Sequence, residues 1–407
     1  MMLGDFDKMN ILICYPGTIE KSGGMQYICA QFANAMFERG HRVAVCWYGS
    51  NKIRSFYHYA EHVTFYSLRP SAIPLEAEYH DVGRDVSLSN KIIREGIRFF
   101  SRKAYRRWND YCKGKILFPQ IRLVTQTFRP DVIVSFGSDM TCFLGEIAKE
   151  VPTITMMHTD PRHIFRDSYL NEIEALQRSY AIQVLSPSYV EVVKKYCPKT
   201  KVVYIPNPVQ QIRPLANIAK AKEEYYIIDV ARLNKDKQQH VLINAFAKLA
   251  GDFPKWNLEL WGDNQTYHAY VNSLIRLIKK YKLEDRITLC GTSNNIADVY
   301  RKADIFGFPS AYEGFGLALV EAMSAGLPAL GFKTCTSVNE LIKDGVTGLL
   351  ADEDIDSFAE KLRCLMKNKE IRIRLGEKAR LEAEQFAPVH VWNTWEKLLN
   401  EANVSRE

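Results

Sequence analysis

Apolar runs alternate with amphipathic stretches along the first half of the chain. Six of these runs are almost continuously apolar, as parallel strands buried on both faces tend to be. They are NILICYP (10–16), HRVAVCWY (41–48), DVIVSFG (131–137), TITMMH (153–158), AIQVLS (181–186) and KVVYIP (201–206). Between the first two, MQYICAQFANAMFERG (25–40) has the period of a helix and ends on Gly40, as a C-cap would.

The same alternation starts again near residue 225. A second series of strands is predicted by YYIIDVA (225–231), NLELWG (257–262), RITLCG (286–291), DIFGFPS (304–310) and PALGF (328–332). Two successive series of this kind predict an α/β protein with two Rossmann-like, doubly wound parallel-sheet domains, which we expect to face a cleft.

A proline-rich stretch separates the two series. IPNPVQQIRPLAN holds three prolines between positions 206 and 214, which is typical of a linker. We therefore expect a first domain over residues 1–210 and a second over 215–388. The tail FAPVHVWNTWEKLLNEA (386–402) has the pattern of a helix with Trp392 and Trp395 on one side. We expect this C-terminal helix, residues 389–407, to pack back on the first domain.

Length and composition agree with this picture. A chain of 407 residues is too long for one compact core, and 47% apolar with 25% charged residues is typical of a globular protein. Neither a run of 18 apolar residues nor the layout of a signal peptide occurs. The nine cysteines are scattered and form no CxxC pair. We expect reduced thiols and a cytoplasmic protein.

The stretch EGFGLALVE (313–321) follows a predicted strand and carries a glutamate at each end. It could be the acid pair of a glycoside hydrolase, a nucleotide-binding loop, or an ordinary turn from strand to helix. Eight residues of helix would separate the two glutamates by roughly 12 Å. Glycoside hydrolases place their carboxyl groups roughly 5 to 9.5 Å apart, so the acid pair is disfavoured. The other two interpretations remain open at this point.

The nucleotide interpretation assigns a role to each part of the stretch. A glycine turn that opens a helix leaves unpaired amides, and those of Phe315, Gly316 and Leu317 would meet a phosphate. Glu321 would accept hydrogen bonds from vicinal ribose hydroxyls, as acidic residues do in dinucleotide folds. Glu313, before the turn, would do the same for a second sugar.

These residues resemble a known family. Glu313 and Glu321 with the intervening GFGLALV are similar to the E-x7-E motif of glycosyltransferase family 4, a group of retaining, nucleotide-sugar-dependent enzymes with the GT-B fold. ARLNKDK places Arg232 and Lys237 five positions apart, similar to the diphosphate clamp of this family. SGGMQ (22–26) resembles its glycine-rich loop, and MMHTD resembles its strand that ends in a histidine, here His158. The resemblance spans most of the chain and is densest from about residue 225 to 350.

The resemblance implies a function and a set of site residues. The enzyme would move a hexose, with retention, from a nucleotide sugar, most simply a UDP-sugar, to a glycan or lipid-linked acceptor bound by the first domain. Bacterial surface polysaccharide or lipopolysaccharide synthesis is the expected setting. The implied catalytic residues are His158, Arg232, Lys237 and Glu313, with His158 contacting the donor sugar. Gly23 and Gly24 would let the diphosphate and acceptor approach closely.

No cofactor or metal is expected beside the nucleotide sugar, because the nine histidines and nine cysteines form no ligand-spaced cluster. The chain also departs from the family pattern. Ala231 replaces the glycine of the family's GRL, and Gln238 stands where glycine commonly follows the lysine. Two alternatives remain, a nucleotide-sugar epimerase of the same fold and a non-catalytic glycan-binding protein. No partner among nucleic acids is indicated.

Positive charge is concentrated in one segment. Residues 84–115 hold ten Lys/Arg and three Asp/Glu, which equals the whole net charge of +7. The pattern of 90–115 predicts a helix with one apolar face made of Ile93, Ile97, Phe100, Ala104, Trp108 and Tyr111, and with Arg94, Arg98, Arg102, Arg106 and Lys113 on neighbouring faces. It is either a helix packed on its own domain with a solvated basic side, or an element that meets an anionic membrane or phosphate-bearing acceptor.

Overall fold

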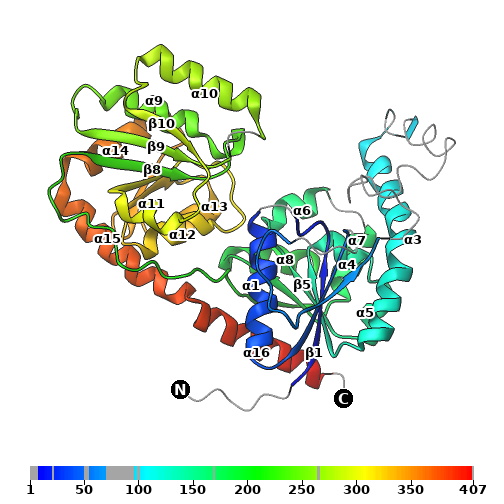
Figure 1. The fold of residues 1–407 in the computed structure, drawn as a ribbon. Coiled ribbons are helices and arrows are strands. Elements are labelled where there is room, and N and C mark those ends of the chain that lie inside the picture. The colour runs from blue at the N-terminus through cyan, green and yellow to red at the C-terminus, as the bar shows by residue number, and fades with distance from the viewer. Residues whose placement is uncertain are drawn as a thin grey trace. The chain divides into compact units, whose positions relative to one another are not determined.

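The computed structural model describes residues 8–20, 23–49, 55–69, 96–97, 99, 101–167, 170–263 and 266–405. The chain divides into two compact units, one formed by Met1–Pro206 with Val391–Glu407 and the other by Asn207–His390. Each unit contains one parallel sheet with helices packed on it, so the predicted pair of α/β sheets is confirmed (Figure 1).

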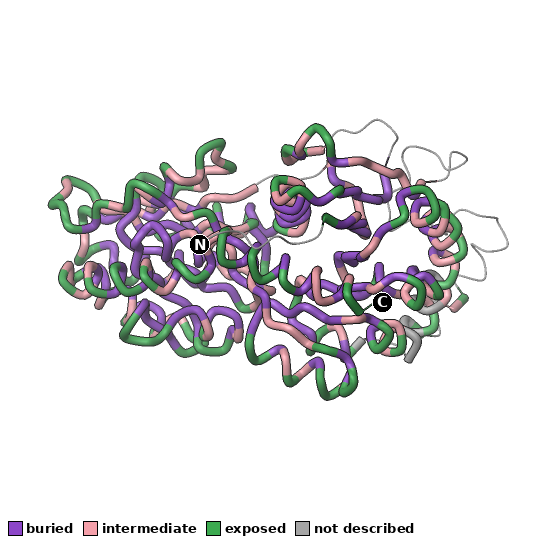
Figure 2. The backbone as a smooth tube through the Cα atoms, turned by 90° about the horizontal axis from the view of Figure 1, so that it is seen from below, coloured by how far each residue is buried: buried purple, intermediate pink, exposed green. Residues whose placement is uncertain are grey.

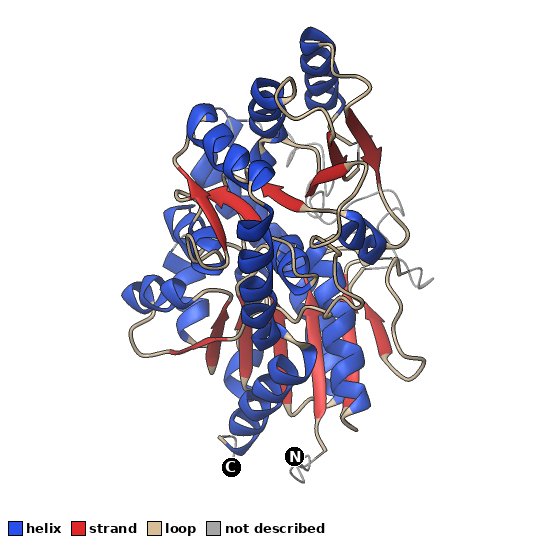
Figure 3. Ribbon diagram, turned by 90° about the vertical axis from the view of Figure 1, so that its left-hand side faces the viewer, coloured by secondary structure: helices blue, strands red, loops and turns tan. Residues whose placement is uncertain are grey.

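The sheet of the first unit has seven parallel strands in the order β3-β2-β1-β4-β5-β6-β7. They are β1 (Asn10–Tyr15), β2 (Arg42–Trp47), β3 (Thr64–Ser67), β4 (Val132–Phe136), β5 (Thr153–Met156), β6 (Ala181–Val184) and β7 (Lys201–Tyr204). The strand order reverses between β1 and β4. The central strands are buried along their length because helices cover both faces, as Figure 3 shows.

The helices of the first unit are α1 (Gly24–Glu38), α3 (Arg102–Phe128), α4 (Ser138–Cys142), α5 (Ile147–Glu150), α6 (Pro161–Asp167), α7 (Leu170–Gln177), α8 (Pro187–Tyr196) and most of α16 (Pro388–Val404). Helix α1 ends at Glu38, and Gly40 has φ 90°, which confirms the predicted glycine cap. On α16, Trp392 and Trp395 pack edge-on against Phe32 of α1, with ring centroids 5.8 and 5.1 Å apart.

The sheet of the second unit has six parallel strands in the order β10-β9-β8-β11-β12-β13. They are β8 (Tyr225–Val230), β9 (Trp256–Trp261), β10 (Ile287–Gly291), β11 (Ile305–Phe308), β12 (Ala329–Phe332) and β13 (Gly348–Ala351). The helices are α9 (Gln239–Leu249), α10 (His268–Tyr281), α11 (Ile296–Lys302), α12 (Leu317–Ser324), α13 (Thr336–Leu341), α14 (Ile355–Lys367) and α15 (Lys369–Ala383), with short 3-10 turns η2 (Lys235–Lys237) and η3 (Glu384–Phe386).

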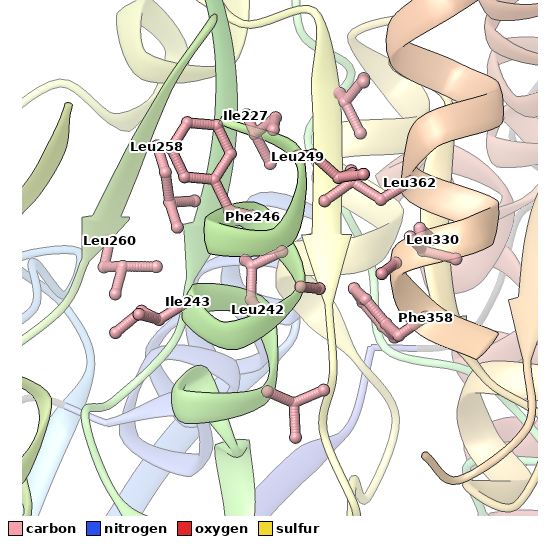
Figure 4. Packing of buried hydrophobic residues seen from close by; sticks show 14 of the residues in the cluster. Ile227, Leu242, Ile243, Phe246, Leu249, Leu258, Leu260, Leu330, Phe358 and Leu362 are labelled. Atoms are coloured by element: carbon pink, nitrogen blue, oxygen red, sulfur yellow. The ribbon is translucent and has the colours of Figure 1, made fainter. Parts of the chain in front are cut away.

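One apolar cluster holds the second unit together. Side chains of β8, β9 and β12 meet those of α9 and α14 in the close view of Figure 4, where Phe246 lies between Ile227 and Leu258 and Leu362 approaches from α14. All four of these side chains are fully buried. Figure 2 shows buried residues mainly in the interior of each unit and exposed residues mainly along its outer turns. This core fixes the strand ends on which the candidate site is built.

The structure corrects the prediction for the basic segment. Helix α3 begins at Arg102 and runs to Phe128, and its buried face is formed by Leu117, Ile121, Val124 and Phe128 together with Lys113. Ala104 and Tyr111, predicted on the apolar face, are exposed, and Lys113, predicted outside it, is buried. Gly96, Ile97 and Phe99 are helical as predicted, and Ile97 and Trp108 of the predicted apolar face are half-buried. The buried residues described on α3 lie mostly after residue 115, beyond the stretch from which the apolar face was predicted.

The rest of the basic-segment prediction lies outside the described residues. These are the positions 84–95, 98 and 100 and the side chains of Arg102, Lys103, Arg106 and Arg107. Within the part of the chain that is described, no helix is both long and apolar enough to span a bilayer.

Candidate active site

The candidate site of the second unit lies where its strand order reverses. Strands β8 and β11 are neighbours, but the chain continues from β8 toward β9 on one side and from β11 toward β12 on the other. Open parallel sheets bind ligands at the carboxyl ends of such strands, because the two following loops diverge there. The loop after β8 carries Arg232 and Lys237, and the loop after β11 carries Glu313 and Gly316.

The loop after β8 is held by its own polar groups. The side chain of Asn234 caps η2 by accepting a hydrogen bond from the Lys237 amide at 3.2 Å. Leu233 anchors the loop in the core, with no exposed surface. The side chain of Arg232 is exposed, and no ion pair joins it to another described residue. Its guanidinium is therefore available to an anionic ligand, with a planar geometry suited to phosphate oxygens.

Lys237 joins this loop to the one after β11. Its Nζ lies 2.6 Å from Oε1 of Glu313 and donates to the carbonyl oxygen of Tyr312 at 3.0 Å. The backbone continues the connection, since the Ala311 amide donates to the carbonyl of Asp236 at 2.9 Å. Both charged side chains are largely buried, at 12 and 13% exposure. The sequence assigned Lys237 and Glu313 to two different parts of a donor and gave no sign of their contact.

The start of α12 has the predicted glycine turn. Gly316 has φ 94° and ψ 51°, a left-handed conformation that favours glycine, and Leu317 is the first residue of the helix. The Phe315 ring is buried and packs on Phe386 with centroids 5.6 Å apart. Among the described residues, no acceptor is hydrogen-bonded to the amides of Phe315, Gly316 or Leu317. The turn therefore offers free donors at a helix start.

Glu321 lies one turn into α12 and meets a buried tyrosine. The hydroxyl of Tyr300 on α11 donates to Oε2 of Glu321 at 2.8 Å. Burial raises the pKa of Glu321 to about 7, and the hydrogen bond from Tyr300 acts in the opposite direction. Tyr300 has no exposed surface, so its hydroxyl holds the Glu321 carboxylate from the interior of the unit. Near neutral pH this group is divided between its acid and carboxylate forms.

The glycine-rich loop of the first unit also lies where a strand order reverses, between β1 and β4. The Gly23 amide donates to the hydroxyl of Tyr57 at 3.3 Å. Gly24 is the first residue of α1 and is exposed. A side chain at Gly23 would meet only the movable end of Gln26. Gly23 thus immediately precedes the helix that follows β1, and Gly24 begins that helix.

His158 follows β5, one strand along from the same reversal. Its ring stacks on Phe136 of β4, with centroids 5.0 Å apart and planes at 28°. Its Nε2 is sealed from solvent and has no hydrogen-bond partner among the described residues. Burial lowers the pKa of His158 to about 4. The imidazole is therefore neutral at physiological pH, which suits a hydrogen-bonding role better than proton abstraction.

Sequence reasoning missed three buried residues that support this site. Tyr300 carries no sequence signal, because 21 positions separate it from Glu321. Asp229 is fully buried, and its position as the one charge within the apolar run YYIIDVA could have drawn attention to it. Gln239, the first residue of α9, donates a hydrogen bond from its side-chain amide to the Asp229 carboxyl group. Among the described residues, no three His, Cys, Asp or Glu side chains are grouped so that they could hold a metal ion.

Comparison with protein families gives two matches that follow one another along the chain. The model described as Glycosyltransferase Family 4 matches residues 22–211, and the model described as Glycosyl transferases group 1 matches residues 213–382. The second match contains the whole β8 to α12 region. The first contains Gly23, Gly24 and His158.

Three curated proteins are similar to this chain, each over a different share of its own length. An uncharacterized glycosyltransferase of Haemophilus influenzae is 22% identical over 94% of this chain and 97% of its own. An exopolysaccharide phosphotransferase of Streptomyces coelicolor is 33% identical over 48% of this chain, but the match spans only 20% of that protein. The N-acetylgalactosamine-N,N'-diacetylbacillosaminyl-diphospho-undecaprenol 4-alpha-N-acetylgalactosaminyltransferase of Campylobacter jejuni is 27% identical over 47% of this chain and 51% of its own.

Solved structures share the fold of the whole chain. A sucrose-phosphate synthase of Thermosynechococcus elongatus superposes with a TM-score of 0.76 at 16% identity, covering 98% of this chain and 100% of its own. Anabaena HepE in complex with UDP and glucose gives 0.68 at 18% identity, covering 96% and 99%. At these identities the likeness shows the fold alone.

Proposed function

The chain belongs to glycosyltransferase family 4 with the GT-B fold, and on this premise we propose that it transfers a hexose-type sugar from a UDP-sugar to a glycan or lipid-linked acceptor. The proposal includes retention of the anomeric configuration and independence of metal ions. It places the reaction in the synthesis of a bacterial surface polysaccharide or lipopolysaccharide. The relatives named for exopolysaccharide and undecaprenol-linked substrates support this setting.

The observation that carries the proposal is the meeting of cations and free amides at the β8/β11 reversal. When a sugar leaves a nucleoside diphosphate, the bond from the anomeric carbon to the phosphate oxygen breaks and that oxygen gains negative charge. The Lys237 ammonium and the amides at the start of α12 are held in place before the reaction, and the exposed Arg232 guanidinium lies on the same loop as Lys237; all three would attract that charge. Such preorganised electrostatic stabilisation is usually the largest contribution to catalysis.

The Lys237–Glu313 contact gives each residue a role. An ammonium has three donors, and two of those of Lys237 are used by Glu313 and Tyr312. The third is available for a diphosphate oxygen. The second oxygen of the Glu313 carboxylate is available for a hexose hydroxyl. One ion pair would thus connect the sugar and the diphosphate of the donor, on either side of the bond that breaks.

Glu321 is the proposed ribose acceptor. Tyr300 occupies its Oε2 and leaves Oε1 for the vicinal hydroxyls of the nucleoside. UDP is favoured as the nucleotide on the family resemblance, and HepE, which has the same fold, is known in complex with UDP and glucose. Neutral His158 is proposed to contact the donor sugar.

Retention needs no protein base in the scheme we favour. The acceptor oxygen attacks the anomeric carbon from the face that the diphosphate leaves. The acceptor proton passes to the departing phosphate oxygen, so atoms and charge balance without a further group. The low pKa of His158, about 4, agrees with this assignment because it makes the histidine a weak base.

A thermal-shift screen with a panel of nucleotides and nucleotide sugars tests the donor assignment. UDP and one UDP-hexose are expected to raise the unfolding midpoint, since a ligand that binds only the native state stabilises it. ADP, GDP and their sugars are expected to give smaller shifts. A larger shift with a purine nucleotide would reject UDP, and no shift with any nucleotide would reject the donor site.

A further inference from the structure

Two fully buried polar residues, Asp229 and Gln239, lie beneath the loop that carries Arg232, and the proposed mechanism uses neither. Asp229 stands on the central strand β8, and Gln239 is the first residue of α9. Both have no exposed surface. The side-chain amide of Gln239 donates through Nε2 to Oδ2 of Asp229 at 3.0 Å and to the carbonyl oxygen of Arg232 at 3.2 Å.

Burying these two polar side chains lowers the stability of the folded state. Burial raises the pKa of Asp229 to about 7, against the lowering effect of the Gln239 amide. Within the described chain, Oδ1 of Asp229 and Oε1 of Gln239 have no hydrogen-bond donor. A buried polar atom without a partner destabilises the native state, and an apolar pair at the same place would avoid this. Stability alone therefore does not account for the pair.

The geometry shows what the pair holds. The Arg232 carbonyl also accepts from the Asn234 amide at 2.9 Å, so both of its lone pairs are engaged. Gln239 ties this carbonyl to the first turn of α9, and Asp229 fixes the Gln239 amide from the strand. The peptide bond between Arg232 and Leu233, directly after the Arg232 side chain, is thereby joined to strand β8 and helix α9.

We propose that Asp229 and Gln239 are positioning residues that orient Arg232 toward the departing diphosphate. The inference rests on the proposed function, in which Arg232 acts on the charge that develops on the leaving group. Positioning residues of this kind lower the entropy that the catalytic group loses in the transition state. Gln239 acts through its bond to the backbone, and Asp229 acts through Gln239.

Two variants and a matched control test the proposal by kinetics with the full-length protein. Gln239→Met keeps the length of the side chain but removes the amide, and kcat is expected to fall about three- to tenfold, the range for one hydrogen bond. Asp229→Asn keeps an oxygen that accepts from Gln239, so its kcat should fall less than that of Gln239→Met. The control is Asp304→Asn. Asp304 is equally buried at the opposite end of the sheet, where it accepts from the Tyr226 amide at 2.9 Å.

The control separates positioning from stability. All three variants are expected to lower the unfolding midpoint, but only Gln239→Met is expected to lower kcat clearly. In an Arg232→Ala background, Gln239→Met should change kcat no further, because its effect passes through the missing guanidinium. A full additional loss in that background, or an equal kcat loss in Asp304→Asn, would overturn the proposal.

Hydrogen exchange gives a readout that does not depend on activity. In Gln239→Met, the amides of residues 233–238 should exchange faster while those of β11 and β12 keep their protection. If the wild-type protein transfers no sugar, the proposed function fails, and this measurement still decides whether the pair holds the loop. Unchanged exchange in the loop would refute the positioning role whatever the activity.

Discussion

At the scale of single residues, the candidate site combines two cations with two carboxylates of different character. Glu313 is paired with Lys237 at 2.6 Å. Glu321 is paired with a neutral tyrosine, and its pKa is raised to about 7. The first carboxylate therefore belongs to an ion pair with Lys237, whereas the pKa of the second lies near neutral pH.

Arg232→Ala and Lys237→Ala are each expected to lower kcat by about 10²- to 10³-fold, the loss seen when one preorganised donor to a developing charge is removed. Steady-state kinetics with a saturating donor measures the effect. Lys235→Ala is a matched control, because Lys235 is an exposed cation of the same loop without a contact to Glu313. Transfer at the wild-type rate by both site variants would disprove the clamp.

Glu313→Gln is expected to tighten the binding of UDP and to slow transfer. Glu313→Gln removes one negative charge beside Lys237, so the ammonium interacts with the diphosphate alone. For a carboxylate and a phosphate charge about 8 Å apart at an intermediate dielectric constant, the lost repulsion is about 1 kcal/mol, or about fivefold in UDP affinity. Transfer falls because the hexose loses its acceptor. Calorimetry with UDP alone measures the first effect. Weaker UDP binding would show that the carboxylate supports the nucleotide instead of competing for Lys237.

Glu321 should make nucleoside binding depend on pH. Its pKa of about 7 lies above the ordinary value, so the carboxylate that accepts from ribose is formed only as the pH rises through 7. The affinity for uridine, which carries no phosphate that titrates in this range, should rise about tenfold from pH 6 to pH 8. Glu321→Gln should remove this dependence, and an unchanged slope in that variant would assign it to another group.

The sequence predicted the residues of the site better than their contacts. Arg232, Lys237, Glu313, Gly316 and Glu321 could be found because they occur at short, fixed spacings along two loops. The Lys237–Glu313 pair joins positions 76 apart and follows only from the adjacency of β8 and β11. Contacts that depend on strand order leave no local pattern in the sequence.

At the scale of elements, the turn between η2 and α9 has a left-handed backbone conformation that favours glycine, but the residue there is Gln238. Gln238 has φ 49° and ψ 35°, a left-handed conformation that costs a residue with a side chain roughly 1–2 kcal/mol. This is the position where the sequence resemblance led us to expect glycine. The structure thus explains the departure as a strained residue that keeps the glycine conformation.

Gln238→Gly is therefore expected to stabilise the second unit by about 0.5–1 kcal/mol, since the relief of strain exceeds the entropy that glycine adds to the unfolded chain. The unfolding midpoint should rise by about 1–4 °C. Lys282→Gly is the matched control, because Lys282 has φ 54° at the end of α10, away from the site. A lower midpoint for Gln238→Gly, with Lys282→Gly stabilised, would show that the Gln238 side chain is needed.

Most of the described strands were predictable because each lies within a run of mainly apolar residues. Two were missed. Strand β3 (Thr64–Ser67) lies at the edge of its sheet and is only half-buried, and β13 (Gly348–Ala351) is a short edge strand. Length does not explain the omission, since β5, β6, β7, β11 and β12 also have four residues and were predicted. The two missed strands have weaker apolar runs, because TFYS has a hydroxyl residue at each end and GLLA starts with glycine. The apolar face of the basic segment was predicted only in part, because the buried residues described on α3 lie mostly after residue 115.

At the scale of the whole molecule, the chain consists of two α/β units whose strand orders each reverse once. Each reversal carries one group of candidate residues, Gly23 and Gly24 in the first unit and Arg232 to Glu321 in the second. The repeated architecture explains why the fold could be inferred from two series of apolar runs. The choice of donor sugar and acceptor depends on individual side chains, which periodicity does not report.

The most direct test of the account is a transfer assay with a UDP-hexose panel, polyprenyl-diphosphate-linked saccharides as acceptors and excess EDTA. The proposed function predicts that one acceptor gains one hexose in the same linkage configuration as the donor and that UDP is released in equal amount. Lys237→Ala should slow both about 10²- to 10³-fold. Donor consumption with release of free sugar or an epimer, and no gain by any acceptor, would contradict it.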